Sequence, residues 1–595
     1  MVVTVGKGKV LLCGLNAKFI HSSLALRYLQ AYTLASSGLQ INIKEFTINQ
    51  TTRDIMADIY QQQPDILGFS CYIWNINEIL DLCADYKKVA PQTVIILGGP
   101  EVSYDAEQLL QDNPYVDYVV RGEGEVTFNE LIVALRGDQP LKNINGISYR
   151  YDGQIYNNQD RELIADLDVI PFPYQNELDK LTDRIVYYES SRGCPFRCSY
   201  CLSSTSKRVR SFSMEKVKSD LALMLRYQVR EIKFVDRTFN YDEKRAREII
   251  SFIIEHRGTV KIHFEIDANL FSDSMLEYLS DVPSDLFNFE IGIQSTFKPA
   301  LDAVRRNLNW ERLSYNLKRL LSRKNIHLHL DLIAGLPEED FDNFNRSFNM
   351  VYNLQPDVLQ LGFLKLLKGS DLLKESERYG YIYQSKSPYQ VLSNRYITYD
   401  QILILNRIED ILDRYYNSGD MRETIPYITS VIYNNNAIRF YDEYSHYWHT
   451  NRLFEVGHKK EELYNYLQSF INEKYPNHFD ITNELLKYDY LCNNHRYGLP
   501  TGLYSFNPDK INDLIYSYTK DKNFIAEHLS TFAAKTPREI KKLIHIEYFQ
   551  VNPRTYQKVD HNLALMFIYD PIKNVVAKII NLENHNIFIS PTTRT

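Results

Sequence analysis

The sequence predicts an α/β protein in which two successive regions of alternating strands and helices precede a mainly α-helical region. Short apolar runs alternate with helical patterns over residues 1–140, the alternation resumes over residues 184–370, and it stops after residue 371. Strands that alternate with helices form parallel sheets. A chain of 595 residues is long enough for about three domains. We therefore expect domains at 1–140, 184–370 and 371–595, with a linker at 141–183.

The first region predicts a doubly wound sheet of the Rossmann or flavodoxin type. Its strands are expected at residues 10–15, 41–46, 65–70, 94–99 and 118–120, with a helix at 22–35. Such sheets bind ligands beyond the carboxyl ends of their strands. A nucleotide site is disfavoured, because no G-x-G-x-x-G follows the first strand. The strand ends carry polar residues and glycines that let a bulky ligand approach the backbone, namely Asn16, Ser70, Gly98, Gly99, Glu101, Gly122 and Glu123.

The linker contains a predicted β-hairpin. Residues 147–156 alternate around Asp152-Gly153, which is a strong hairpin signal. Pro171 and Pro173 then favour an extended segment. We expect this linker to be a plain connection between two domains.

The second region predicts a partial TIM-type (β/α)6 barrel. Strands are expected at residues 185–189, 231–235, 261–266, 286–293, 327–333 and 358–363, with helices between them such as 214–227 and 243–255. The chemistry of such barrels is located at the carboxyl ends of the strands. The first strand leads there into a loop with three cysteines.

That loop, residues 190–201, predicts a metal centre. Cys194, Cys198 and Cys201 are three of the seven cysteines in the chain, and short gaps between ligands keep the entropy of loop closure small. A structural zinc would need a fourth ligand nearby, and the next downstream histidine is His263. An iron–sulfur cube with one open iron suits three ligands better, although a three-ligand zinc or a surface cysteine cluster stays possible. An odd number of scattered cysteines argues against disulfides and favours the reducing cytoplasm.

The C-x3-C-x2-C spacing, with Tyr200 before the last cysteine, resembles the cluster loop of the radical SAM superfamily. The segments Leu-Gly-Phe-Ser, Leu-Gly-Gly-Pro-Glu and Arg-Gly-Glu-Gly-Glu, in this order over residues 9–136, resemble the cobalamin-binding domain that precedes many radical SAM cores. The resemblance implies three cofactors: a [4Fe–4S] cluster on the cysteines, S-adenosylmethionine (SAM), and cobalamin at the strand ends of the first sheet. The D-x-H-x-x-G loop that supplies a cobalt ligand elsewhere is absent. His21 stands nearby, but we expect it to make local hydrogen bonds and the cobalt to lack a protein imidazole.

The resemblance also assigns SAM-binding residues at the barrel strand ends. Glu265 would take the ammonium group and Gln294 the ribose or carboxylate. Arg306 would pair with the methionine carboxylate, for which a guanidinium has the right geometry. The backbone of Tyr200 and the segment 331–337 would contact adenine. Glu265 and Asp331 could instead be structural, and either Arg306 or the adjacent Arg305 could face solvent. The role of Asp236 stays open, and no catalytic residue is assigned beyond the cluster.

The C-terminal region, residues 371–595, predicts helices at 396–416, 459–475 and 479–493 and a hairpin of strands 563–568 and 575–580. It resembles only an uncharacterised extension behind some cobalamin-binding radical SAM cores. The basic residues in 535–542 indicate a solvated helix face rather than an RNA-binding patch. We expect this domain to cap the barrel and shape a substrate pocket, because radical intermediates must be kept from water.

In related enzymes a 5′-deoxyadenosyl radical abstracts hydrogen and methylcobalamin then methylates an unactivated carbon; the resemblance implies this activity here. The alternatives are a non-methylating rearrangement or cyclisation, and a non-catalytic corrinoid-binding protein. We expect a small-molecule or peptide substrate and an electron donor such as flavodoxin or ferredoxin. A net charge of −7 and a pI near 6.1 do not favour nucleic acid, and no apolar run approaches membrane-spanning length.

Overall fold

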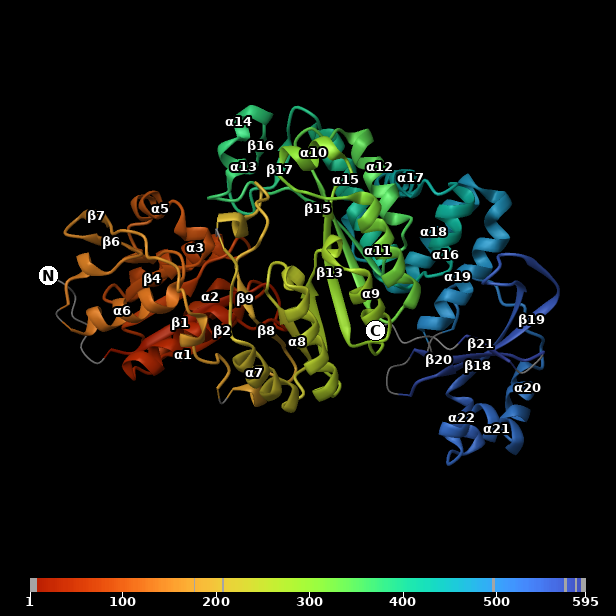
Figure 1. Ribbon diagram of the computed structural model, residues 1–595. Coiled ribbons are helices and arrows are strands. Elements are labelled where there is room, and N and C mark those ends of the chain that lie inside the picture. The colour runs from red at the N-terminus through yellow and green to blue at the C-terminus, as the bar shows by residue number, and fades with distance from the viewer. Residues whose placement is uncertain are drawn as a thin grey trace. The chain divides into compact units, whose positions relative to one another are not determined.

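The computed structural model describes residues 8–137, 139–175, 177–205, 208–494, 498–571, 575–583 and 586–589. The chain forms two compact units, which are described separately below. The first unit contains Met1–Phe341 and Gly362–Tyr399, and the second contains Asp342–Leu361 and Asp400–Thr595. In Figure 1 the colours run from red at the N-terminus to blue in the second unit.

A seven-stranded sheet in the order β2-β1-β3-β4-β5-β6-β7 opens the first unit. Strands β1 to β5 pair in parallel, as the alternation predicts. The hairpin predicted in the linker forms, and its strands β6 and β7 pair antiparallel and extend this same sheet. The strands are β1 (Val10–Asn16), β2 (Asn42–Thr47), β3 (Ile66–Ser70), β4 (Val94–Gly98), β5 (Tyr118–Val120), β6 (Ile147–Tyr151) and β7 (Gln154–Asn157).

Helices cover both faces of this sheet. One apolar cluster joins Leu12 and Ile96 to Leu26 and Phe128, and a second joins Leu11 and other strand residues to helices on the opposite face. The parallel strands are apolar on both sides because both sides are covered. The helices are α1 (Leu24–Ser37), α2 (Thr52–Gln62), α3 (Ile76–Val89), α4 (Pro100–Ser103), α5 (Ala106–Asp112) and α6 (Gly124–Arg136).

A second sheet has six strands in the order β15-β14-β13-β12-β11-β8, so strands that follow one another in this part of the chain are neighbours. Consecutive strands from β8 to β14 pair in parallel. This order is the partial barrel that the sequence predicts. The strands are β8 (Ile185–Tyr188), β11 (Glu231–Phe234), β12 (Lys261–Glu265), β13 (Phe287–Gln294), β14 (His327–Ala334) and β15 (Val358–Phe363); the short β9 (Ser191–Arg192) and β10 (Arg210–Ser211) pair separately.

The two sides of the barrel strands differ in polarity. Along β13 and β14, fully buried apolar side chains alternate with partly accessible ones such as Glu290 and Asp331. Helices lie beside these strands in Figure 1, and the partly accessible Glu290 and Asp331 line one cavity. The helices are α7 (Met214–Arg226), α8 (Glu243–His256), α9 (Asp273–Ser280), α10 (Lys298–Ala303) and α11 (Trp310–Arg323). Apart from Phe341, the next helix α12 (Phe341–Tyr352) belongs to the second unit, as do residues 358–361 of β15.

The segment 364–399 returns to the first sheet and holds it to the barrel. Tyr389 donates a hydrogen bond to Glu101, and Lys368 pairs with Asp105 at 2.8 Å. Asn77 also donates to the carbonyl of Ser387 at 3.2 Å. The segment contains α13 (Asp371–Lys374), α14 (Ser376–Tyr379), β16 (Ile382–Tyr383) and β17 (Val391–Ser393).

The second unit combines helices with a four-stranded antiparallel sheet, β18-β19-β20-β21. The predicted hairpin is β19–β20, whereas β18 and β21 were not predicted. The buried helix α19 packs on this sheet through residues such as Tyr488 and Leu491. The elements are α15 (Tyr399–Leu412), α16 (Thr424–Tyr427), α17 (Ala437–Thr450), α18 (Lys460–Lys474), α19 (Phe479–Asn493), α20 (Ile511–Tyr518), α21 (Lys522–His528), α22 (Pro537–Lys541), β18 (Ile544–Val551), β19 (Lys558–Tyr569), β20 (Val576–Asn581) and β21 (Ile587–Ile589).

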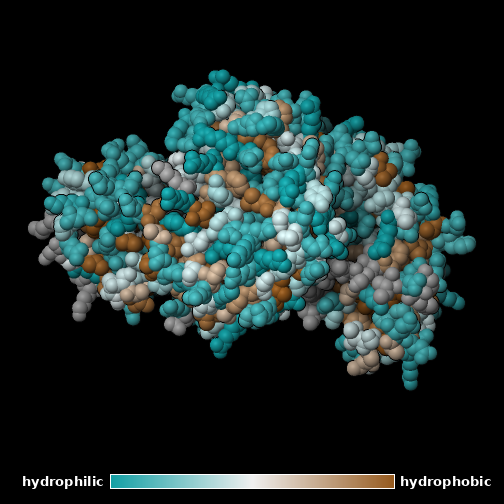
Figure 2. All heavy atoms as spheres, viewed as in Figure 1, coloured by the Kyte–Doolittle hydropathy of each residue, from teal (hydrophilic) through white to brown (hydrophobic). Residues whose placement is uncertain are grey.

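Hydrophilic residues cover most of the face shown in Figure 2, and hydrophobic residues lie between them in small groups. Within the described ranges, no helix combines the length and apolarity that crossing a membrane requires.

Candidate functional site

The cysteine loop is held in place by hydrogen bonds at both ends. Asp236, 1% exposed after β11, accepts hydrogen bonds from the backbone N–H of Ser190 at 2.8 Å and from the Ser190 and Ser191 hydroxyls at 2.6 Å each. Further along, the backbone N–H of Ser199 donates to the carbonyl of Val304 at 3.0 Å. Asp236, whose role the sequence left open, thus orders the start of the loop.

The three cysteines open into one cavity of about 280 Å³ at the carboxyl ends of the barrel strands, which we call the cysteine cavity. All four candidate SAM residues line it as well. Its walls include Cys194, Cys198, Tyr200, Cys201, Arg237, Thr238, Glu265, Asp267, Glu290, Gly292, Gln294, Arg306 and Asp331. The structure therefore brings together residues that lie more than a hundred positions apart in the sequence.

The end of β13 has an unusual backbone at Gln294. This residue has φ +72°, and the pairing with β14 shifts between Gly292 and Gln294. A Cβ atom on Gly292 would lie 2.2 Å from Nε2 of Gln294, so the amide occupies space that a larger residue would fill. Among the described side chains, Oε1 of Gln294 is a buried acceptor without a hydrogen-bond partner. A buried acceptor left unpaired is costly and suits a ligand that donates a hydrogen bond.

Two charged residues face the cysteines from the barrel. Arg306 donates to Sγ of Cys198 at 3.8 Å and to the carbonyl of Gly292. Burial raises the pKa of Glu265 to about 7, although the positive charge of Arg237 acts to lower it. Nη1 of Arg237 lies 3.9 Å from Oε1 of Glu265. The cavity thus presents a guanidinium close to one thiol and a carboxyl that titrates near neutral pH.

The residues around the three cysteines suit an iron–sulfur cluster with SAM beside it. The common cavity, the adjacent Arg306 and the unpaired acceptor of Gln294 are all consistent with a cluster and SAM bound together.

A larger cavity of about 970 Å³ lies where the first sheet faces the barrel, and we call it the sheet-edge cavity. Of the candidate cobalamin residues, Asn16, Gly99, Gly122 and Glu123 line it. Ser70 and Gly98 line a smaller apolar hollow of about 120 Å³, which shares Gly99 and Gly122 with it. Glu101 lines neither, because its carboxylate turns to Tyr389 and is only 5% exposed.

Glycines shape the rim of the sheet-edge cavity. Gly99 has φ +109°, and a Cβ atom there would lie 2.5 Å from the carbonyl oxygen of Cys71. Gly122 has φ +72°, and a Cβ atom there would meet nothing within 4 Å. At Gly122 the backbone therefore borders open space, as an approaching macrocycle requires.

The polar residues on the rim are already engaged. Glu123 accepts hydrogen bonds from Arg210 at 2.6 Å and from the backbone of Ile164 at 2.8 Å. Burial would raise the pKa of Glu123, but these bonds and the charge of Arg192 lower it. Asn16 donates to the carbonyl of His21 and to Glu45, at 3.1 Å each. These two side chains thus fix the cavity walls.

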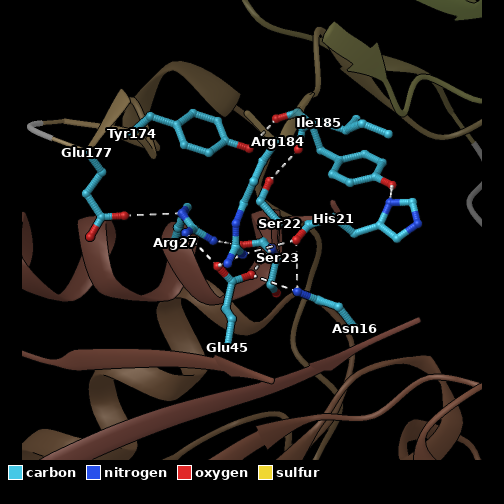
Figure 3. A network of polar contacts seen from close by, with 11 residues as sticks. Asn16, His21, Ser22, Ser23, Arg27, Glu45, Tyr174, Glu177, Arg184 and Ile185 are labelled. Atoms are coloured by element: carbon cyan, nitrogen blue, oxygen red, sulfur yellow. Dashed lines mark hydrogen bonds and ion pairs between the residues drawn. The ribbon is translucent and has the colours of Figure 1, made fainter. Parts of the chain in front are cut away.

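A buried network behind this cavity connects the first sheet to β8 (Figure 3). Glu45 of β2 pairs with Arg27 at 2.8 Å and with Arg184 at 3.4 Å. Nδ1 of His21 lies 2.7 Å from the hydroxyl of Tyr187, and the His21 ring also lines the cavity. The His21 side chain thus makes a hydrogen bond, but its partner Tyr187 lies 166 positions away in the sequence, so the bond is not the local one that was expected.

Sequence reasoning missed two features of the sheet-edge cavity. Tyr72 and Trp74 stack with ring centroids 4.4 Å apart in its wall. Arg237 lines both this cavity and the cysteine cavity. The position of Arg237 directly after Asp236, at the end of a barrel strand, could have marked it as a candidate site residue.

Three family matches cover most of the chain. Residues 10–132 match the B12 binding domain, residues 188–351 match the radical SAM superfamily, and residues 377–567 match a family described as "Protein of unknown function (DUF4080)". The chain therefore contains a B12-binding domain followed by a radical SAM domain. Cobalamin, SAM and a [4Fe–4S] cluster are therefore its cofactors.

Curated relatives of this chain include methyltransferases. It is 29% identical to an uncharacterized methyltransferase of Pyrococcus horikoshii over 57% of this chain and 74% of the relative. It is 28% identical to the cobalamin-dependent radical SAM methyltransferase TokK of Streptomyces tokunonensis, over 47% of this chain and 44% of TokK. It is 26% identical to the 2-(S-pantetheinyl)-carbapenam-3-carboxylate methyltransferase of Streptantibioticus cattleyicolor, over 56% of this chain and 52% of that relative. The chain thus spans about half the length of the last two.

Solved structures share the fold. The cobalamin-dependent SAM radical enzyme OxsB with aqua-cobalamin bound superposes with a TM-score of 0.56 at 18% identity, over 81% of this chain and 79% of OxsB. The radical SAM methyltransferase TsrM of Kitasatospora setae, with tryptophan and a SAM analogue bound, superposes with a TM-score of 0.53 at 13% identity, over 64% of this chain and 79% of TsrM.

Proposed function

We propose that this chain is a cobalamin-dependent radical SAM methyltransferase that methylates an unactivated carbon. One observation carries the proposal: the cysteine cavity and the sheet-edge cavity lie in the same compact unit and share Arg237 in their walls. A substrate held at Arg237 would border both cavities. Methyl-transferring relatives of two matched regions support the reaction type.

When bound, the cluster and SAM supply a hydrogen-abstracting radical, and cobalamin supplies the methyl group. Cys194, Cys198 and Cys201 would hold three irons as thiolates, and Arg306 would stabilise the negative charge at Cys198. The carboxylate of Glu265 would accept the SAM ammonium group, and Oε1 of Gln294 would accept a hydrogen bond from the ribose or ammonium.

The first sheet would position the corrin ring. Asn16, Gly99, Gly122 and Glu123 border the sheet-edge cavity, and Ser70 and Gly98 border the hollow below it, so we assign these six to cobalamin. Glu101 would act indirectly, by binding Tyr389 in the segment 364–399. A reductant is required; we propose flavodoxin or ferredoxin, with a small molecule or peptide as substrate.

Isotope transfer tests this function. Anaerobically reconstituted holoenzyme is incubated with methyl-deuterated SAM, a reductant and a metabolite extract of the cells that make it, and products are identified by mass spectrometry. We expect 5′-deoxyadenosine, S-adenosylhomocysteine and a product carrying the deuterated methyl group. The Cys198→Ala variant should form none of these, whereas Cys492→Ala, which changes a thiol of the second unit, should match the wild type. Formation of 5′-deoxyadenosine alone would instead indicate a non-methylating reaction.

A further inference from the structure

Arg237 stands at the junction of three cavities. Besides the cysteine cavity and the sheet-edge cavity, it lines a side cavity of about 300 Å³ with Ser203, Thr205, Arg192 and Arg210. Among the described residues that line these cavities, Arg237 alone belongs to all three. A group bound to its guanidinium would therefore lie between the cluster side and the corrin side.

The backbone on both sides of Arg237 is fixed. The preceding Asp236 accepts three hydrogen bonds from Ser190 and Ser191. The hydroxyl of the following Thr238, a residue 5% exposed, lies 3.4 Å from Sγ of Cys194. The Arg237 side chain, in contrast, is 57% exposed. A long side chain on a rigid base is thus directed into open space.

The other arginines of the side cavity are neutralised by carboxylates. Arg192 pairs with Glu125 at 2.5 Å, with Glu189 at 2.9 Å and with Glu123 at 3.4 Å. Arg210 pairs with Glu123 at 2.6 Å. These pairs also occupy the carboxylates of the side cavity, so they do not repel an incoming anion strongly.

Arg237 is different, because its ion pair within the described ranges is a distant one, with Glu265 at 3.9 Å. Glu265 is also the residue to which we assign the SAM ammonium group. When SAM takes this carboxylate, the guanidinium of Arg237 loses its nearest counter-charge and keeps only the weaker influence of Cys201, Glu189 and Cys194. The planar donor fork of a guanidinium matches a carboxylate or phosphate.

We propose that Arg237 binds an anionic group of the substrate, a carboxylate or a phosphate, and so places the reacting carbon between SAM and cobalamin. This inference rests on the proposed methyl transfer. The SAM carboxylate is the other anion available to Arg237, and the experiment below separates the two.

The first arm uses the wild-type holoenzyme and the deuterated-SAM assay. The extract is passed over an anion-exchange resin at low ionic strength, and the retained and unretained fractions are assayed separately. We expect the labelled product only from the retained fraction. A labelled product from the unretained fraction would overturn the anionic substrate and leave methyl transfer intact. No label from either fraction or from whole extract would reject methyl transfer, and the inference with it.

The second arm compares Arg237→Gln, Arg237→Lys and the control Arg305→Gln with the active fraction as substrate. Arg305 is surface-exposed and pairs with Asp371 and Glu375. Loss of a charge-assisted hydrogen bond predicts a rise in the apparent KM for the fraction of about 10- to 100-fold in Arg237→Gln, with partial recovery in Arg237→Lys. The KM for SAM in the absence of extract, read as 5′-deoxyadenosine formation at about pH 9, where Glu265 is ionised in every variant, should not change. An equal rise in the KM for SAM would assign Arg237 to the SAM carboxylate and overturn the proposal. Iron and corrinoid contents equal to wild type establish that each variant is folded.

Discussion

Glu265 links the residues on the barrel side of the cysteine cavity. Arg237, Lys233, Glu290 and Asp236 surround it, and burial is the main reason that its pKa rises to about 7. A carboxyl group binds an ammonium group well only when it is ionised. SAM affinity should therefore depend on pH in the neutral range.

The direction of this pH dependence follows from the raised pKa of Glu265. Below about pH 7 Glu265 is protonated, so SAM binding should weaken as pH falls from about 8 to about 6 and strengthen as it rises. Glu265→Gln should bind SAM roughly 10-fold more weakly at pH 8 and lose this dependence, because a neutral amide does not titrate. Equilibrium dialysis of radiolabelled SAM on the cluster-loaded protein measures both. An unchanged pH profile in Glu265→Gln would contradict the assignment.

Several residues of the cysteine cavity could be predicted from the sequence. The three cysteines share a short loop, and the resemblance to the radical SAM superfamily assigned Glu265, Gln294 and Arg306, which stand at or shortly after strand ends. Arg237 also stands shortly after a strand end. Its local sequence does not predict that three cavities meet there, because their walls derive from separate parts of the chain.

At the scale of elements, the sheet-edge cavity depends on the turns that follow the parallel strands. The turn after β4 places Gly99 at φ +109° and ψ 174°, a conformation that is essentially restricted to glycine. The turn after β5 places Gly122 at φ +72° beside open space. Replacement by alanine should therefore change the stability of the protein by different amounts at Gly99 and at Gly122.

Gly99→Ala should lower the free energy of unfolding of the first unit by about 1–3 kcal/mol through backbone strain, with the clash at the Cys71 carbonyl as an additional cost. Gly122→Ala should lower the free energy of unfolding by only about 1–2 kcal/mol, because the strain of a left-handed backbone conformation is its one penalty. Urea denaturation of the cofactor-free variants, followed by circular dichroism, compares the two. A Gly99→Ala protein as stable as Gly122→Ala would show that the turn after β4 relaxes freely.

The parallel strands could be predicted because both of their faces are buried, so they read as continuous apolar runs. In the second unit this signal was weaker. Strand β18 alternates Ile544 and Ile546 with His545 and Glu547, a period-two pattern typical of a strand. That alternation could have predicted β18. Its pairing with β19, in contrast, depends on long-range packing against α19.

At the scale of the whole molecule, both cofactor cavities belong to the first unit. The segment 364–399 returns to the first sheet through Tyr389, Lys368 and Ser387, and the network around Glu45 joins that sheet to β8. These contacts keep the strand ends of the two sheets facing one another. The role of residues 371–595 as a substrate cap stays a prediction.

Metal and corrinoid contents after anaerobic reconstitution test the central claim most directly. The protein is loaded with iron, sulfide and hydroxocobalamin, desalted, and measured by metal analysis and visible absorbance, alongside a Cys194→Ala, Cys198→Ala, Cys201→Ala triple variant. We predict about four irons and one corrinoid per wild-type chain, and a triple variant that loses the iron but keeps the corrinoid, because the sheet-edge cavity contains none of these cysteines. Folded wild-type protein that took up zinc instead of iron and showed no corrinoid absorbance would contradict the account.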